Sequence, residues 1–198
     1  VIFFISQWGM YVSAFTGVLP ENVSYAEYAR QGFFELCSVC AINAALIFTV
    51  NAFTKKAGRW ADIALRIIKA ITAIFSIVLA ATALSKMFLY IGAYGLTLKR
   101  VLASWLIILL LIVFVFVIIS QITYRFRFNA ALLIAFAILF GTLVFSDVPT
   151  IVAEYNTEAY QSGELLNIDA NELYYECGEA GIPSLVLLSK SAPDEDLR

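Results

Sequence analysis

Long apolar stretches, separated by short polar or basic segments, dominate the first three quarters of the chain. A helix that crosses a bilayer needs about 20 mostly apolar residues to cover about 30 Å of hydrocarbon. Such stretches lie at about residues 1–18, 33–53, 67–91, 101–122 and 130–145. The pattern therefore predicts five membrane-spanning helices.

A soluble helical bundle and a β-sheet are the alternatives to membrane spans. A helix in a soluble bundle keeps a polar stripe on one side, whereas residues 105–119 include no polar residue. Strands are disfavoured because the long runs lack period-two alternation and turn residues. We therefore predict an all-α, polytopic integral membrane helical bundle.

Local signals place the ends of several predicted helices. Ser24 and Glu27 have the spacing of a capping box, which predicts a helix start before the span 33–53. Residues 94–97 predict a turn between the third and fourth spans, and Asn129 can cap the fifth.

The first span, 1–18, ends just before Pro20 and has no starting Met. We expect an incomplete first span of a longer protein. A signal peptide is the alternative, but the stretch lacks a basic flank and is too long for one.

The C-terminal quarter differs in composition from the rest. Of the 15 acidic residues, eleven lie from Asp147 onward. Pro149 suits a first helical turn, and apolar residues then recur at helical spacing as far as Gly163. Asp169 and Glu172 repeat the capping-box pattern, and residues 182–189 can form a last short helix. We predict that residues 149–198 form a small, acidic, helical tail in water.

The distribution of Lys and Arg predicts the orientation in the membrane. Basic residues gather in the loops 54–66 and 123–129, which five alternating spans place on the same side. Loops rich in Lys and Arg lie on the cytoplasmic side. Lys99 and Arg100 oppose this assignment, two residues against six. We expect both loops to be cytoplasmic and the tail to be extracytoplasmic.

Two charged residues lie within the predicted spans. Glu35 and Lys86 each lie about 12 Å inward from the outer end of their helix, and each costs about 2.5–3.5 kcal/mol to insert at a helix centre. We predict that they form a buried ion pair, or share a small polar cavity with Tyr90, Tyr94 and Arg100. In the alternative, Lys86 extends toward the outer surface and Glu35 binds a hydroxyl group or water.

Other polar residues in apolar surroundings have simpler interpretations. Glu27 is expected to complete the capping box, and Arg30 to be an interfacial cation. Asn43 and Asn51 are expected to form hydrogen bonds between helices.

Cysteine usage gives no redox prediction. Cys37 and Cys40 form a CxxC pattern inside a span, away from any helix end that could lower a thiol pKa. We therefore expect both to pack in the core. Cys177 has no obvious partner within the chain.

Catalytic, cofactor-binding and metal-binding residues are not predicted. The chain has no His, which is the commonest general base and metal ligand. It also lacks a nucleophile elbow, a phosphate-binding loop and the spacing of a Ca²⁺ loop. Basic clusters are confined to short membrane-flanking loops, which disfavours nucleic-acid binding.

Three blocks of sequence resemble a known family. They are YAEYARQGFF at 25–34, LYIGAYGLT at 89–97 with Arg100 after it, and VAEYN at 152–156. In order and spacing they are similar to the C-terminal half of a bacterial multi-pass membrane family catalogued as domain of unknown function 4173. The resemblance implies a bacterial plasma-membrane protein with further spans upstream, and it implies no activity. That family usually has an acidic residue where this chain has Gly92, which weakens a transport or enzymatic interpretation.

Three functions are consistent with these observations. The first is a structural or regulatory membrane component whose tail contacts a protein partner or the cell envelope. The size of the tail and the lack of a polar stripe on the fourth and fifth spans favour it. A solute or lipid transporter would use the region of Glu35 and Lys86, with a water-accessible cavity and a discontinuous helix. A membrane enzyme has the least support. The expected partners are the lipid bilayer, a protein that contacts the tail and the missing N-terminal spans.

Overall fold

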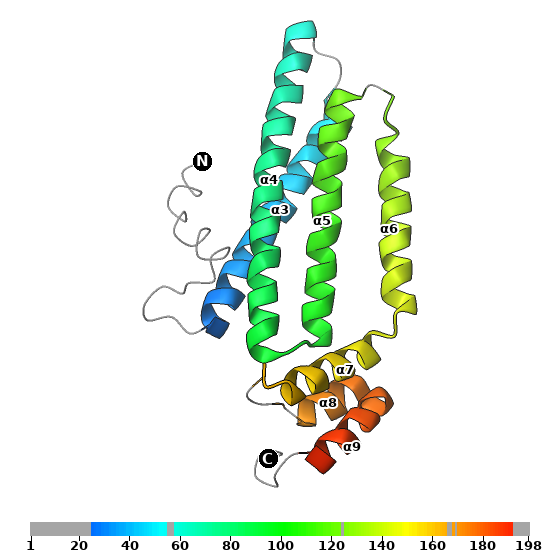
Figure 1. Cartoon of the computed structure of the whole chain (residues 1–198). Helices are drawn as coiled ribbons and strands as arrows, with labels where there is room; N and C mark the ends of the chain where they lie inside the picture. The colour runs from blue at the N-terminus through cyan, green and yellow to red at the C-terminus, as the bar shows by residue number, and fades with distance from the viewer. Residues whose placement is uncertain (1–24, 55–57, 124, 166–167, 169, 192–198) are drawn as a thin grey trace.

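The computed structural model describes residues 25–54, 58–123, 125–165, 168 and 170–191 (Figure 1). Every regular element in these residues is a helix, which confirms the all-α prediction. The predicted span 1–18 and Ser24 lie outside the described residues. In order, the elements are α3 (Tyr25–Phe53), α4 (Arg59–Tyr94), α5 (Leu98–Ile122), α6 (Phe128–Phe145), α7 (Val148–Gln161), α8 (Ala170–Cys177), the 3-10 helix η1 (Gly178–Gly181) and α9 (Ile182–Ser191).

Helices α3 to α6 are each long and apolar enough to cross a membrane, and they correspond to four of the five predicted spans. The chain is therefore a membrane protein built on a helical bundle. Helix α4 has 36 residues, which gives it a length of about 54 Å at 1.5 Å per residue. The predicted membrane span 67–91 is part of this helix, and residues 59–66 form two turns before it.

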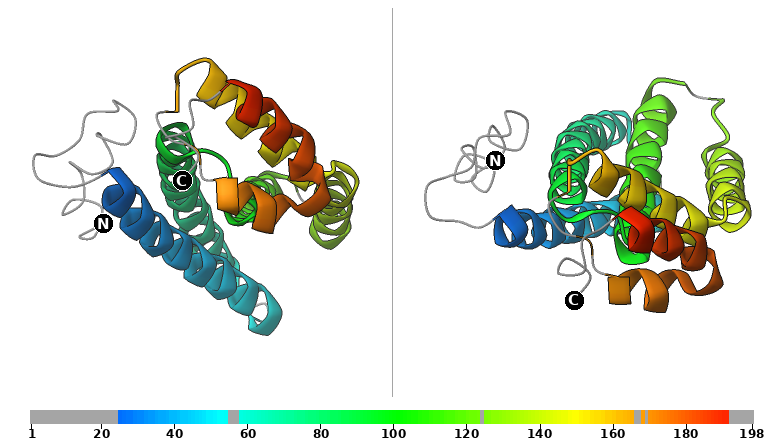
Figure 2. Two further views of the ribbon diagram at one scale, coloured as in Figure 1. Left: turned by 90° about the horizontal axis from the view of Figure 1, so that it is seen from below. Right: turned by 60° about the horizontal axis from the view of Figure 1, so that its bottom comes forward.

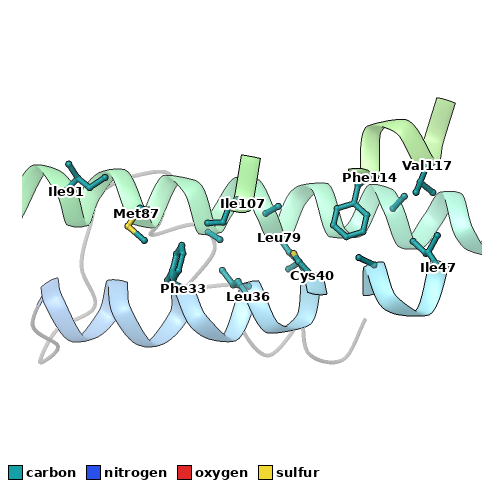
Figure 3. Close-up of a cluster of buried hydrophobic side chains, with 14 residues drawn as sticks. Phe33, Leu36, Cys40, Ile47, Leu79, Met87, Ile91, Ile107, Phe114 and Val117 are labelled. Carbon is teal, nitrogen blue, oxygen red and sulfur yellow. The ribbon is translucent and has the colours of Figure 1, made fainter. Parts of the chain in front are cut away.

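The bundle core lies between α3, α4 and α5 (Figure 3). On α3 the buried residues recur every three or four positions, so they form one stripe along the helix. Small residues on α4 allow its neighbours to approach closely, as is common between membrane helices. The labelled core residues are Phe33, Leu36, Cys40 and Ile47 of α3, Leu79, Met87 and Ile91 of α4, and Ile107, Phe114 and Val117 of α5.

Helix α6 lies beside α5 and has no buried residue in the described part of the chain. The indole Nε1 of Trp105 donates a hydrogen bond of 3.0 Å to the carbonyl oxygen of Leu139, and the Trp105 ring lies 6.0 Å from that of Phe136. The start of α6 differs from the prediction, since the N-cap is Arg127 and Asn129 lies in the first turn. Phe128, the first residue of α6, packs its ring 5.8 Å from the Phe48 ring of α3.

The two ends of the bundle are different. The end of α3 and the start of α4, and likewise the end of α5 and the start of α6, lie at one end, while the turn at 95–97 and helices α7 to α9 lie at the other (Figure 1). Helix α7 follows α6 after two residues and lies across the end of the bundle, with α8 and α9 packed against it (Figure 2). Pro149 is in the first turn of α7, as predicted.

Helices α7 to α9 have a small core of their own, formed by Val152, Ala153, Leu173, Cys177 and Leu188. Leu96, from the turn between α4 and α5, and Leu98, the first residue of α5, pack against this core. The tail is thus joined to the bundle by packing as well as by the chain.

Candidate functional site

Lys86 is buried although it lies in a membrane-spanning helix, and its side chain is 1% exposed. The ammonium group lies against Gly32 of α3, where a Cβ atom would come within 2.5 Å of Nζ. A glycine at this position therefore makes room for the cation. Burying a charge inside a membrane bundle is costly, so such a residue is a functional candidate.

Glu35 lies one turn beyond Gly32 on α3, and its side chain is exposed. A direct ion pair between Glu35 and Lys86 stays a prediction. The side chains of Glu27 and Arg30, the secondary candidates, lie outside the described residues.

Arg100 joins Tyr90 and Tyr94, the remaining candidates, at the end of α4. Its guanidinium donates to the carbonyl oxygen of Tyr94 at 2.8 Å and also to that of Gly95. It lies 4.3 Å from the centre of the Tyr90 ring, a cation–π contact, and the rings of Tyr90 and Tyr94 are 5.1 Å apart. The last carbonyl groups of a helix have no partner within it and carry partial negative charge. Arg100 therefore closes the C-terminus of α4.

The same turn is held from the other side by the tail. The side-chain amide of Asn156, on α7, accepts a hydrogen bond from the Leu96 N–H and donates one to the Leu96 carbonyl, both at 2.7 Å. Asn156 thus satisfies both backbone groups of a residue 60 positions earlier in the chain.

Gly95 makes this contact possible. Its backbone angles are φ 78° and ψ 179°, a region that is essentially restricted to glycine. A Cβ atom at this position would come within 2.6 Å of Asn156 Oδ1. The turn therefore needs a glycine both for its conformation and for the approach of the tail.

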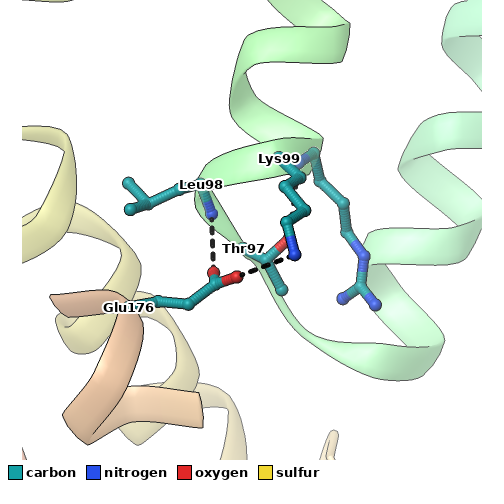
Figure 4. Close-up of polar contacts among 5 residues, drawn as sticks. Thr97, Leu98, Lys99 and Glu176 are labelled. Carbon is teal, nitrogen blue, oxygen red and sulfur yellow. Dashed lines mark hydrogen bonds and ion pairs between the residues drawn. The ribbon is translucent and has the colours of Figure 1, made fainter.

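Glu176, on α8, forms a second contact between the tail and this turn (Figure 4). Its carboxylate accepts from the Leu98 N–H at 3.3 Å and lies 3.6 Å from Lys99 Nζ. An acidic group is stabilised near a helix N-terminus, and Leu98 begins α5. Lys99 is 90% exposed, so the ion pair itself contributes less than about 1 kcal/mol.

A cavity of about 20 Å³ remains where the turn meets the tail, lined in part by Tyr94, Asn156, Glu176 and Cys177. This space suits a single water molecule, whereas small-molecule sites are typically about 300–1,000 Å³. The geometry is that of a joint between two parts of the protein, and not that of a substrate site.

Asn156 and Glu176 were not among the functional residues predicted from the sequence. Asn156 ends the block VAEYN and Gly95 and Leu96 lie in the block LYIGAYGLT, two of the blocks that carried the family resemblance. The structure shows that these two blocks contact each other. The presence of both blocks in the sequence was the signal that could have pointed to Asn156.

Hydrogen bonds also connect α3 and α4 within the bundle. Asn43 Nδ2 donates to Ser76 Oγ at 2.9 Å, and Lys69 Nζ donates to Asn51 Oδ1 at 2.9 Å. These contacts confirm the prediction that both asparagines bond between helices. Cys40 is buried in the core, and its thiol donates to the Ser76 carbonyl at 3.6 Å.

Neither the curated proteins nor the solved structures include a match to this chain. A sequence model of the family described as Domain of unknown function (DUF4153) matches residues 1–188. The match supports a family of unknown function, but not the number 4173 that the sequence blocks suggested. Because the match covers nearly the whole chain, the protein belongs to the DUF4153 family.

Proposed function

We propose that this protein is a structural or regulatory membrane component whose tail, helices α7 to α9, contacts a protein partner or the cell envelope. The observation that carries the proposal is the joint described above. Asn156 and Glu176 hold the tail to the turn between α4 and α5 through three hydrogen bonds to backbone groups. A tail fixed in this way presents its outer surface in one orientation relative to the membrane.

The outer surface of the tail has the composition of a contact surface. Tyr174 and Tyr175 are 57% and 80% exposed, and aliphatic side chains of α9 are also exposed. Tyrosine is enriched at protein interfaces. Most acidic residues of the chain lie in this part of the sequence, which favours a partner with a basic surface. The exposed aliphatic residues of α9 are Ile182, Val186 and Leu187.

We further propose that the tail lies outside the cytoplasm, at a bacterial plasma membrane. Arg59 and Arg66 lie in the first turns of α4, and Arg127 is the N-cap of α6. Both helix starts lie at the end of the bundle opposite the tail (Figure 1). Clusters of Lys and Arg favour the cytoplasmic side. A Tyr175→Cys variant in a cysteine-free background should react with a membrane-impermeant maleimide in intact cells, and a Trp60→Cys variant should not. The reverse labelling pattern would refute this orientation.

A solute or lipid transporter is the second candidate, and the burial of Lys86 favours it. Transporters commonly have discontinuous helices at their binding sites. Helices α3 and α4 are uninterrupted in the described residues beside Lys86. This continuity supports the structural role.

A complementation experiment distinguishes the two functions. In a strain that lacks its own copy of the protein and shows a growth defect, we expect Lys86→Met to restore growth and Tyr174→Ser with Tyr175→Ser to fail. Gln161→Ala, at an exposed position of α7, is the matched control in the tail and should restore growth. All variants are compared at equal amounts in the membrane. Failure of Lys86→Met together with full activity of the tyrosine variant would favour transport and refute the proposal.

A further inference from the structure

A polar groove of about 260 Å³ lies between α3 and α4 at the end of the bundle opposite the tail. Asn51, in the last turn of α3, and Thr54, just after that helix, form one side of the groove. Arg66 and Lys69, from the start of α4, form the other. None of these residues takes part in the joint with the tail.

The two cations of the groove form no ion pair within the described residues. Arg66 and Lys69 are three residues apart on one helix, so they lie on the same face and repel each other. Lys69 donates to Asn51 Oδ1 at 2.9 Å, and the described part of the chain gives Arg66 neither a hydrogen bond nor an ion pair. An anion between them would relieve the repulsion, and the Arg66 guanidinium could bind two phosphate oxygens at once.

The groove lies at the depth of lipid headgroups. Residues 70–91 of α4 carry no charge apart from the buried Lys86, and these residues cover about 33 Å. Lys69 therefore lies at one edge of an apolar layer about as thick as bilayer hydrocarbon, which is about 30 Å. Phe53 and Trp60, each 82% exposed, lie among the lining residues in the sequence, and aromatic residues mark the membrane interface.

The remaining lining residues select among anions. Val50 and Leu65 give the groove apolar walls, which suit the glycerol and acyl portion of a lipid better than a free ion. Asp62 also lines the groove, so with Arg66 and Lys69 the net charge is about +1. This balance suits a singly charged phosphodiester better than doubly charged inorganic phosphate.

We propose that this groove binds the phosphodiester headgroup of an anionic phospholipid, with Arg66 and Lys69 as the phosphate ligands. The bound lipid would fasten the first turns of α4 to the end of α3. The site is independent of the role proposed for the tail.

The test uses the full chain purified in a neutral detergent. Binding is measured by native mass spectrometry, and thermal stability in parallel, with dioleoylphosphatidylglycerol, dioleoylphosphatidylcholine and inorganic phosphate as separate probes. We expect phosphatidylglycerol to bind and stabilise the protein, and the other two probes to have little effect. In the Arg66→Gln, Lys69→Gln variant, binding should be about 30-fold weaker, which corresponds to about 2 kcal/mol.

Two further variants distinguish binding in the groove from a general charge effect and from misfolding. Arg125→Gln with Arg127→Gln removes the same charge at the same end of the bundle but outside the groove, and should change binding less than about twofold. Asp62→Asn removes the opposing carboxylate and should tighten binding, a gain that a misfolded variant cannot produce.

Three results would overturn the proposal. The first is binding of phosphatidylglycerol to the Arg66→Gln, Lys69→Gln variant as tight as to the original protein. The second is an equal loss of affinity in the two double variants, which would indicate a diffuse charge effect. The third is stabilisation by inorganic phosphate equal to that by the lipid, which would indicate a site for a free anion.

Discussion

Replacing Asn156 with aspartate tests whether the side-chain amide holds the tail to the bundle. Asparagine and aspartate have nearly the same size and shape, so packing is preserved. One carboxylate oxygen can still accept from the Leu96 N–H, but the other replaces the amino group that donates to the Leu96 carbonyl. The substitution therefore removes one donor and places two oxygen atoms against each other.

The expected cost follows from these two contacts. A buried acceptor left without its partner costs about 1–3 kcal/mol. The Leu96 carbonyl is partly buried, and repulsion between the oxygens adds to the cost, so we expect about 2–3 kcal/mol for Asn156→Asp. Asn156→Ala loses both hydrogen bonds but has no repulsion. Removal of the side chain enlarges the adjacent cavity, so that water can enter it and reach Leu96, and we expect about 1–2 kcal/mol. Asn156→Asp, although closer in shape to the original side chain, should therefore destabilise the joint more than Asn156→Ala.

Hydrogen exchange measured by mass spectrometry reads this effect locally. An opening free energy lowered by about 2 kcal/mol accelerates exchange by about 30-fold in peptides that cover residues 94–98 and α7. Peptides from the centre of α5 should not change. Asn129→Asp, at an exposed position of α6, is the matched control and should leave exchange in the tail unaltered.

The pH dependence gives a second readout. At low pH the introduced carboxyl group regains a proton and can donate to the Leu96 carbonyl again. Because the neutral form is the one that fits the folded state, the destabilisation should shrink as the pH falls toward about 4. Exchange in Asn156→Asp that matches the original protein at neutral pH, or a larger effect of Asn156→Ala, would refute the role of the amide in the joint.

Three further substitutions test other contacts. Gly95→Ala forces alanine into a backbone conformation that only glycine adopts easily, and should lower the free energy of opening of the tail by about 1–3 kcal/mol. Gly92→Ala, where a Cβ atom meets open space, is the control and should be neutral or slightly stabilising. Equal hydrogen-exchange rates in the two variants would refute backbone strain at position 95. Gly32→Ala crowds Lys86 Nζ and should cost about 1–3 kcal/mol in thermal unfolding, and the cost should disappear in a Lys86→Ala background; an unchanged cost there would show that the two residues are not coupled. Trp105→Phe removes the hydrogen bond to Leu139, worth about 0.6 kcal/mol on average in membrane bundles, and should broaden the distance between spin labels on α5 and α6, while an unchanged distribution would show that other contacts hold α6.

The helices could be predicted from the sequence because their cause is local. A run of about 20 apolar residues must form a helix in hydrocarbon, where every backbone group needs a partner within the segment. The run from residue 101 to 122 therefore predicted α5 (Leu98–Ile122) to within three residues. Proline favours the first turn of a helix and glycine favours its end, so Pro149 and Gly163 likewise predicted the position of α7.

The contacts between helices depend on the tertiary structure. Periodicity shows which residues share a face of one helix, but it does not show which neighbour that face meets, because helices in lipid have no hydrophobic preference for one rotation. Lys86 could be recognised as an unusual charge, yet its contact with Gly32 depends on how α3 packs on α4. The pairing of Asn156 with Leu96, and of Glu176 with Leu98, joins residues 60 and 78 positions apart. Such pairs form only when the whole chain has folded, since nothing in either segment specifies the other.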